Sequence, residues 1–242
     1  MGASDIERIA TAVQTAVGTA APPRTVLASV AIAAAAQCTE PCAVLHLGEH
    51  SVRGSSLMGS HVEGYTFMAP VGMQVCAAGV QGAMNAARGS DADVVPAHIA
   101  EDVLLRHVRV PLPGQAVADP VSYEAADGTA LTITPEQQNL GSVFFEEHGT
   151  AGAPAEGSTV YPLTSLVAVA QASVQGAACM HTTDFSGCPP LLLAGAAADL
   201  PGMAERLAAE MQVGEGVVRV VSPGISAAWS GGAAAAAAAS AS

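Results

Sequence analysis

Residues 192–211 read LLAGAAADLPGMAERLAAEM, and this stretch decides the fold. Its apolar start predicts a buried strand over residues 191–193, which ends at Gly195. Small residues follow, and Pro201 then predicts the start of a helix that continues to Met211, because the first turn of a helix does not need the N–H group that proline lacks. The stretch therefore predicts a strand, a tight turn and a helix in succession.

The same pattern continues on both sides of this unit. Downstream, residues 217–221 (VVRVV) predict a strand and residues 227–239 predict a last helix, which runs into an Ala-Ser tract. Upstream, hydrophobic patterning predicts strands over 43–47, 54–59 and 63–68, and helices over 5–17, 26–36, 97–108 and 164–178. A β-meander followed by helices and by alternating strands and helices predicts a mixed α/β fold.

Three connections have their own signals. Residues 122–134 (SYEAADGTALTIT) place Asp127-Gly128 between two β-prone flanks, which predicts a hairpin with a two-residue turn. Residues 111–120 are punctuated by proline, and residues 148–158 contain mostly Gly, Ala and Pro. Both stretches predict loops.

Composition excludes several classes of function. The chain has 242 residues, of which 50% are hydrophobic but only 3% aromatic, so its core must consist of small side chains. The chain has eight basic residues, all of them arginine, and 21 acidic residues. Its net charge is therefore −13. This balance argues against direct nucleic-acid binding, which needs Lys and Arg to neutralise phosphates. The absence of lysine also removes a P-loop lysine and Schiff-base chemistry.

Neither the membrane nor the secretory pathway is indicated. No run of 18 residues is apolar and free of charges and turn formers, so we expect no membrane span. Residues 1–11 lack the apolar region of a secretory signal. The cysteines are odd in number and irregularly spaced, without a second pair at zinc-finger spacing, so we expect free thiols in a reducing compartment. They are Cys38, Cys42, Cys76, Cys179 and Cys188.

A specific resemblance joins the last two helices. Residues 192–211 resemble the strand–loop–helix of the actin family, in which a strand ends at a Gly-Gly turn under the adenine and Pro-Gly opens a helix. Residues 228–233 (AWSGGA) resemble the Trp-x-Gly-Gly helix start near the end of actin and actin-related proteins. Trp-x-Gly-Gly alone would be a weak signal, but its offset after the Pro-Gly helix makes it specific.

The earlier chain follows the same family in order. Residues 25–35 resemble the buried helix before the second phosphate-binding hairpin, and 43–50 (AVLHLGEH) resemble the first strand and turn of that hairpin. Further matches are 62–65 (VEGY) with Tyr-Glu-Gly-Tyr, 122–134 with the hairpin of the fourth subdomain, and 135–145 with the segment leading back to the third. The resemblance thus covers about residues 5–236.

The resemblance implies an α/β, actin-like ATPase-type fold of which only the C-terminal portion is present. Residues 1–70 would form the first part of subdomain 3, residues 71–145 a reduced subdomain 4-like insertion, and residues 146–242 the second part of subdomain 3 with an Ala-rich tail. The first phosphate loop and most of the first two subdomains have no counterpart.

The hairpin that would hold phosphate and magnesium has changed. In actins its turn reads Asp-Ser-Gly-Asp-Gly, whereas residues 46–50 read HLGEH. Only Gly48 is kept, with Glu49 as a longer substitute for an Asp. His46 replaces a carboxylate by an imidazole, which magnesium rarely takes as a ligand. His46 and His50 are four residues apart, but on a strand and turn this spacing does not predict a metal pair.

The adenine and ribose contacts have changed as well. The Gly-Gly turn is Gly195-Ala196, and the Cβ of Ala196 would crowd the base. Ile225 stands near the position of a lysine that flanks adenine, and Leu104 and Leu105 stand near a Lys-Glu pair. We therefore expect Gly48, Glu49, Gly195 and Ala196 to mark a vestigial nucleotide site with no bound MgATP and no metal. The chain also lacks the G-x-S-x-G motif of a nucleophile elbow, so no catalytic residues are predicted.

The resemblance implies a non-catalytic, actin-related structural subunit of a larger assembly, which could be cytoskeletal, axonemal, dynactin-like or chromatin-remodelling. Its partners would be other protein subunits, in the cytoplasm, at the cytoskeleton or in the nucleus. Without the opposing lobe, we expect Leu45, Leu47, Leu57 and Ala197 to border an open cleft that binds a partner. The alternative is a nucleotide-binding ATPase of the actin superfamily that a second chain completes.

Overall fold

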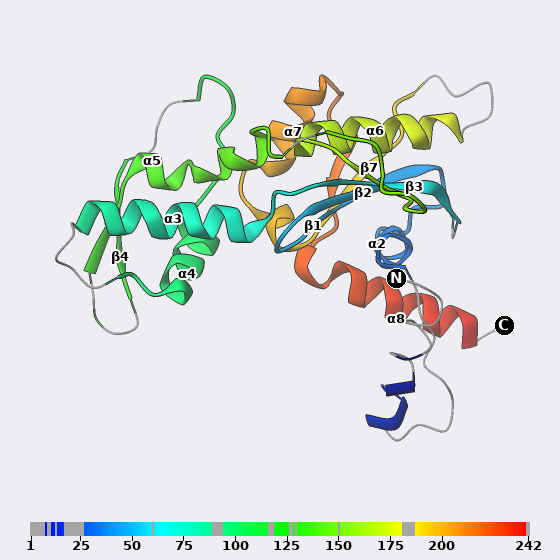
Figure 1. Ribbon diagram of the computed structural model, residues 1–242, viewed down its shortest axis with the longest axis horizontal. Coiled ribbons are helices and arrows are strands. Elements are labelled where there is room, and N and C mark those ends of the chain that lie inside the picture. The colour runs from blue at the N-terminus through cyan, green and yellow to red at the C-terminus, as the bar shows by residue number, and fades with distance from the viewer. Residues whose placement is uncertain are drawn as a thin grey trace.

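The computed structural model describes residues 8, 11–12, 14–16, 27–59, 61–88, 94–115, 119–125, 128, 130–149, 151–180 and 187–240. A six-stranded sheet with helices on both faces forms one part of the molecule, and further helices with a two-stranded sheet extend from one end of it (Figure 1). The prediction of a mixed α/β fold is confirmed.

The large sheet combines an antiparallel meander with parallel strands. Its order is β6-β3-β2-β1-β7-β8, where β1 pairs antiparallel with β2 and β2 with β3, and the remaining pairs are parallel. The strands are β1 (Cys42–Leu47), β2 (Val52–Met58), β3 (His61–Ala69), β6 (Val160–Pro162), β7 (Leu191–Ala194) and β8 (Val218–Val220). The predicted meander and the two later strands are thus confirmed, and β6 was not predicted.

Two cores cover the two faces of this sheet. Helix α6 (Leu166–Cys179) lies on one face, and α2 (Ala28–Ala35) and α8 (Ala227–Ser240) lie on the other (Figure 1). Alternate residues of β1 divide between the faces, since Leu45 packs into the α6 core and Val44 packs with Ile32 of α2. The short helix α7 (Met203–Met211) follows β7. It begins after Gly202, two residues later than predicted.

Small residues let the helices approach closely. A Cβ on Gly54 of β2 would overlap the Ser173 hydroxyl of α6, and a Cβ on Gly176 of α6 would overlap the Ser56 hydroxyl of β2. Ser56 donates a hydrogen bond of 2.7 Å to the carbonyl of Ser173. On the opposite face, a Cβ on Gly231 would overlap the carbonyl of Ala31 in α2. These small residues bring the backbones of neighbouring elements into near contact, in a chain that has few aromatic side chains.

The segment between β3 and β6 lies at the end of the sheet, at the left of Figure 1. It contains α3 (Met73–Arg88), α4 (Ala97–His107), β4 (Val121–Glu124), β5 (Ala130–Ile133), α5 (Pro135–Gln138) and the 3₁₀ helix η1 (Leu140–Phe145). Its buried apolar side chains, such as Met84 and Val103, join the same core as Leu45. The division of the chain at residues 70 and 145 stays a prediction.

One prediction is corrected here, and one helix was not predicted. The hairpin of β4 and β5 exists, but Glu124 pairs with Ala130, so five residues separate the strands and the predicted two-residue turn is wrong. Helix α3 was not predicted at all, although Met73, Cys76, Val80 and Met84 form its buried face. The predicted helix over 5–17 is helical at residues 8, 11–12 and 14–16, and its other residues lie outside the described part of the chain.

Candidate functional site

The ends of β1 and β7 carry two glycine turns that lie side by side. Because β1 and β7 are parallel neighbours, with His46 opposite Ala194, both strands leave the sheet at the same edge. Gly195 has a φ of 102°, and a Cβ there would overlap the carbonyl of Leu47. The structure therefore brings together the two halves of the site that the sequence predicts, Gly48-Glu49 and Gly195-Ala196.

The turn after β1 closes on itself and on α3. The N–H of Gly48 donates to the carbonyl of Ser51 at 3.0 Å. The first amides of α3 are used in the same place, since Met73 donates to the Gly48 carbonyl at 3.1 Å and Gln74 donates to the Glu49 carbonyl at 2.9 Å. A phosphate-binding turn or helix start needs free N–H groups that point at the anion. These three N–H groups are already occupied.

Hydrogen bonds within the chain also hold the turn after β7. The N–H of Gly195 donates to the carbonyl of Gly224 at 2.7 Å. In return, the Gly224 N–H donates to the Asp199 carboxylate at 2.7 Å. Ala196 is half-buried beside this turn. The N–H groups of Gly195 and Gly224 are thus bonded within the chain.

The two histidines of the β1 turn lie in different surroundings. Burial, and secondarily the charge of Arg53 on the neighbouring strand, lower the pKa of His46 below its usual value, so the imidazole is neutral at pH 7. His50 is hydrogen-bonded to Gln74, with 2.6 Å between its Nδ1 and the Gln74 Oε1. Within the described residues, no group of three or more His, Cys, Asp or Glu side chains is arranged to hold a metal ion.

The residues predicted to bind a partner are buried. Leu45, Leu47, Leu57 and Ala197 each have 0% exposed surface. Leu57 lies in the core beneath α2, and the other three lie in the core beneath α6. The prediction that they line an open cleft is therefore wrong, because helices of the same chain cover both faces of the sheet.

The residues predicted near the ribose and the adenine differ in their burial. Leu104 is buried in the core, whereas Leu105 is 61% exposed. Neither side chain offers the charge of the family's Lys-Glu pair. The backbone of Ile225 belongs to the short 3₁₀ helix η3 (Gly224–Ser226), and its side chain lies outside the described part of the structure.

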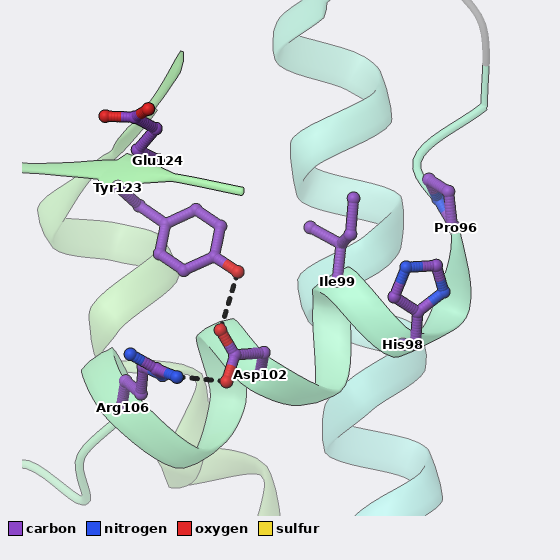
Figure 2. Close-up of a pocket in the computed structure, with 7 residues that line it drawn as sticks. All are labelled: Pro96, His98, Ile99, Asp102, Arg106, Tyr123 and Glu124. Atoms are coloured by element: carbon purple, nitrogen blue, oxygen red, sulfur yellow. Dashed lines mark hydrogen bonds and ion pairs between the residues drawn. The ribbon is translucent and has the colours of Figure 1, made fainter. Parts of the chain in front are cut away.

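Sequence reasoning missed a pocket between α4 and the β4 strand. Its volume is about 750 Å³. In Figure 2, Pro96, His98 and Ile99 lie on one side of the pocket, and Tyr123, Glu124 and Arg106 lie on the other, with Asp102 between the two groups. The signal available in the sequence was only the i, i+4 spacing of Asp102 and Arg106, which is common on exposed helices.

Three polar side chains of this pocket, Asp102, Arg106 and Tyr123, are hydrogen-bonded together. The Tyr123 hydroxyl donates to one Asp102 oxygen at 2.6 Å, and Arg106 Nε donates to the other at 2.7 Å (Figure 2). These hydrogen bonds, first that of Tyr123 and then that of Arg106, hold the pKa of Asp102 below its usual value. The Tyr123–Asp102 hydrogen bond thus joins β4 to α4.

No family model matches the chain, and no curated protein matches it either. Within the residues described, no helix is both long enough and apolar enough to cross a membrane.

Proposed function

We propose that this chain is a non-catalytic, actin-related structural subunit of a larger multiprotein assembly. The observation that carries the proposal is the contact between the turns at Gly48 and Gly195. The actin resemblance, drawn from residues far apart in the sequence, requires both turns to lie beneath one nucleotide. They are adjacent, at the same edge of one sheet.

The rest of the fold supports the actin-like part of the proposal. The helix that the resemblance places before the hairpin, α2, packs beneath that hairpin against Val44 and Leu57. The Trp-x-Gly-Gly helix, α8, crosses α2 at Gly231, where a side chain would not fit. Packing alone therefore explains both motifs, without a bound nucleotide. We infer the third subdomain of an actin-like fold, with residues 71–145 as its reduced fourth subdomain.

The state of the vestigial site supports the absence of catalysis. The amides of Gly48 and Gly195 are bonded to carbonyls of the chain itself. A neutral His46 stands where the family has a carboxylate for the metal-bound waters. With these changes, tight binding of MgATP would require both turns to give up their internal hydrogen bonds.

The proposed role is therefore one of assembly. A net charge of −13 without any lysine suits contact with proteins rather than direct contact with nucleic acid. Cytoskeletal, axonemal, dynactin-like and chromatin-remodelling complexes all fit this role, so the cytoplasm, the cytoskeleton and the nucleus are the proposed locations. The partner would bind a surface other than the buried Leu45, Leu47, Leu57 and Ala197.

The nucleotide part of the proposal is tested by calorimetric titration of the purified chain with MgATP. We expect no saturable binding below the millimolar range. The matched control is the Glu49→Gln variant, which removes the one carboxylate of residues 46–50 while Gly48 and Gly195 keep their hydrogen bonds, and it should bind no better. Micromolar binding by the wild-type chain would instead favour the ATPase that a second chain completes.

The assembly part is tested by the size of the native protein. We expect the tagged chain, expressed at its natural level, to elute from a sizing column well above 23.9 kDa and to retain the same partners in constant ratio after a salt wash. Elution as a free monomer in fresh extracts would overturn the proposal.

A further inference from the structure

Strand β8 leaves one side of its backbone unpaired. It stands at the end of the strand order, with β7 on one side and no described strand on the other. The N–H of Val221 donates to the Leu193 carbonyl of β7 at 2.8 Å. Since alternate residues of a parallel strand bond to the same neighbour, the N–H and C=O groups of Val218 and Val220 point away from β7. Within the described residues, no hydrogen bond uses these outward groups.

The side chains of β8 alternate between the two faces of the sheet. Val218 and Val220 pack against the core beneath α6, whereas Arg219 lies opposite Leu192, which belongs to the core beneath α2. Arg219 is exposed, and its Nε donates to the Gly216 carbonyl at 2.9 Å. It forms no ion pair within the part of the chain that is described. Its two terminal nitrogens can therefore donate to a ligand on the α2 face.

A pocket lies beside Arg219 at this edge of the sheet. It has a volume of about 270 Å³ and is lined by Ala35 and Ala36 at the end of α2, by Leu192 and by residues 219–222. The two alanines occupy little space next to the guanidinium. A strand added to β8 could therefore place a side chain of the size of glutamate in this pocket.

A second copy of this chain does not fit the edge. If two β8 strands pair about a two-fold axis so that all three residues are matched, Val218 lies opposite Val220, and Arg219 lies opposite the Arg219 of the other copy. Like charges directly opposite one another destabilise a strand pair, and charged edge residues commonly prevent such self-pairing. The charge of Arg219 favours a different segment, one with a negative group at the matching position.

We infer that the outer edge of β8 binds an extended segment of a partner subunit, which adds to the sheet as a further strand. The segment carries a glutamate or aspartate opposite Arg219, flanked by apolar residues opposite Val218 and Val220. The carboxylate accepts two parallel hydrogen bonds from the terminal nitrogens of Arg219. The net charge of −13 opposes such a segment only weakly, because physiological salt screens charges more than about 8 Å apart. This inference rests on the proposed function only in assigning the segment to a partner subunit.

A symmetric peptide, acetyl-Thr-Val-Glu-Val-Thr-amide, tests the edge in the purified chain. Its order of side chains is the same in both directions, so its glutamate meets Arg219 in a parallel or an antiparallel arrangement. Amide exchange by NMR should be fast at Val218 and Val220 in the free chain and slow at Val221, which is bonded to β7. We expect saturable binding in the millimolar range that shifts the Val218 and Val220 amide signals and slows their exchange.

Reversal of the charge separates this contact from unspecific binding. The matched peptide acetyl-Thr-Val-Lys-Val-Thr-amide should bind about fivefold more weakly, because an ion pair is replaced by a like-charge contact. With Arg219→Glu the preference should reverse, and with Arg219→Gln it should disappear. Arg219 is exposed, so these variants keep the fold.

Two results would overturn the inference. One is no response of Val218 and Val220 to millimolar glutamate peptide, or the same peptide preference in the wild-type chain and in Arg219→Glu; Arg219 would then only protect the edge. The other is slow exchange at Val218 and Val220 in a free chain that sediments as a dimer, because a second copy would then cover β8. Neither result changes the sizing test of the native protein, in which a partner could bind another surface.

Discussion

Gly195 passes so close to the carbonyl of Leu47 that a side chain does not fit between them. The contact joins the turn after β7 to the last residue of β1, and the positive φ of Gly195 (102°) is a second reason why glycine occupies this position. The edge of the sheet where the two turns meet depends on this one residue.

Gly195→Ala should therefore destabilise the fold by about 2–4 kcal/mol, because the new Cβ meets backbone atoms that cannot move aside and the φ angle becomes strained. Urea unfolding measures the effect. Gly214→Ala is the matched control, since a Cβ there has no neighbour within 4 Å and the backbone has no positive φ. Equal midpoints for the two variants would contradict the proposed packing of the turns.

Gly54→Ala should destabilise the fold by about 1–3 kcal/mol, because the added Cβ overlaps the Ser173 hydroxyl and a Val169 methyl group of α6. The second change Ser173→Gly should recover part of this loss when combined with it, and a double-mutant cycle measures the coupling. Gly82→Ala in α3, where a Cβ has no neighbour within 4 Å, should instead be neutral or slightly stabilising. Additive effects at Gly54 and Ser173 would argue against close packing of α6 on β2.

Gly128→Ala should cost about 1 kcal/mol through backbone strain alone, since its φ is 83° and a Cβ would have no neighbour within 4 Å. Gly128→Asn should cost less, because asparagine tolerates the left-handed region better than alanine does. Thermal unfolding of the two variants provides the comparison. The same loss for both would mean that the positive φ is not what the position requires.

Tyr123→Phe should destabilise the fold by about 0.5 kcal/mol at pH 7, because the phenol donates to a carboxylate that remains partly exposed to solvent. The pKa of Asp102 is lowered in the folded state, so this stabilisation is present above the unfolded pKa of about 3.9 and is lost as the pH falls through the folded value. Urea unfolding at pH 7 and at pH 3 should show the difference between the two proteins shrinking. A difference that does not change with pH would exclude the Tyr123–Asp102 bond as its source.

Trp229 should emit as a water-exposed indole, because the chain has one tryptophan and its side chain is 81% exposed on α8. Acrylamide should quench this emission in the folded chain almost as well as in the urea-unfolded chain. Emission at shorter wavelength that resists quenching would show that another surface covers Trp229 in solution.

Local patterns predicted most of the elements, and their failures have local causes. The apolar run of β1 ends at Gly48, so that strand was readable from sequence. Helix α3 was missed because Gly79 and Gly82 interrupt a pattern that is otherwise helical. The Asp127-Gly128 signal located the hairpin but not the length of its loop, since the pairing of Glu124 with Ala130 is set by the contacts of both strands.

The sequence predicted the residues of the two glycine turns but not the pocket. The actin resemblance named Gly48, Glu49, Gly195 and Ala196, and their meeting in space follows from the parallel pairing of β1 with β7. The pocket at Asp102 and Tyr123 had no such signal, because its walls come from a helix and a strand whose docking no short pattern records.

Composition and the periodicity of neighbouring residues were enough to predict the α/β class, the order of most strands and helices, and a core of small side chains. Tertiary contacts, in contrast, set the burial of Leu45, Leu47, Leu57 and Ala197 and the hydrogen bonds of the Gly48 and Gly195 amides. Burial and hydrogen bonding depend on which distant segments cover a residue. An apolar strand has the same pattern whether a helix of its own chain or a partner lies against it.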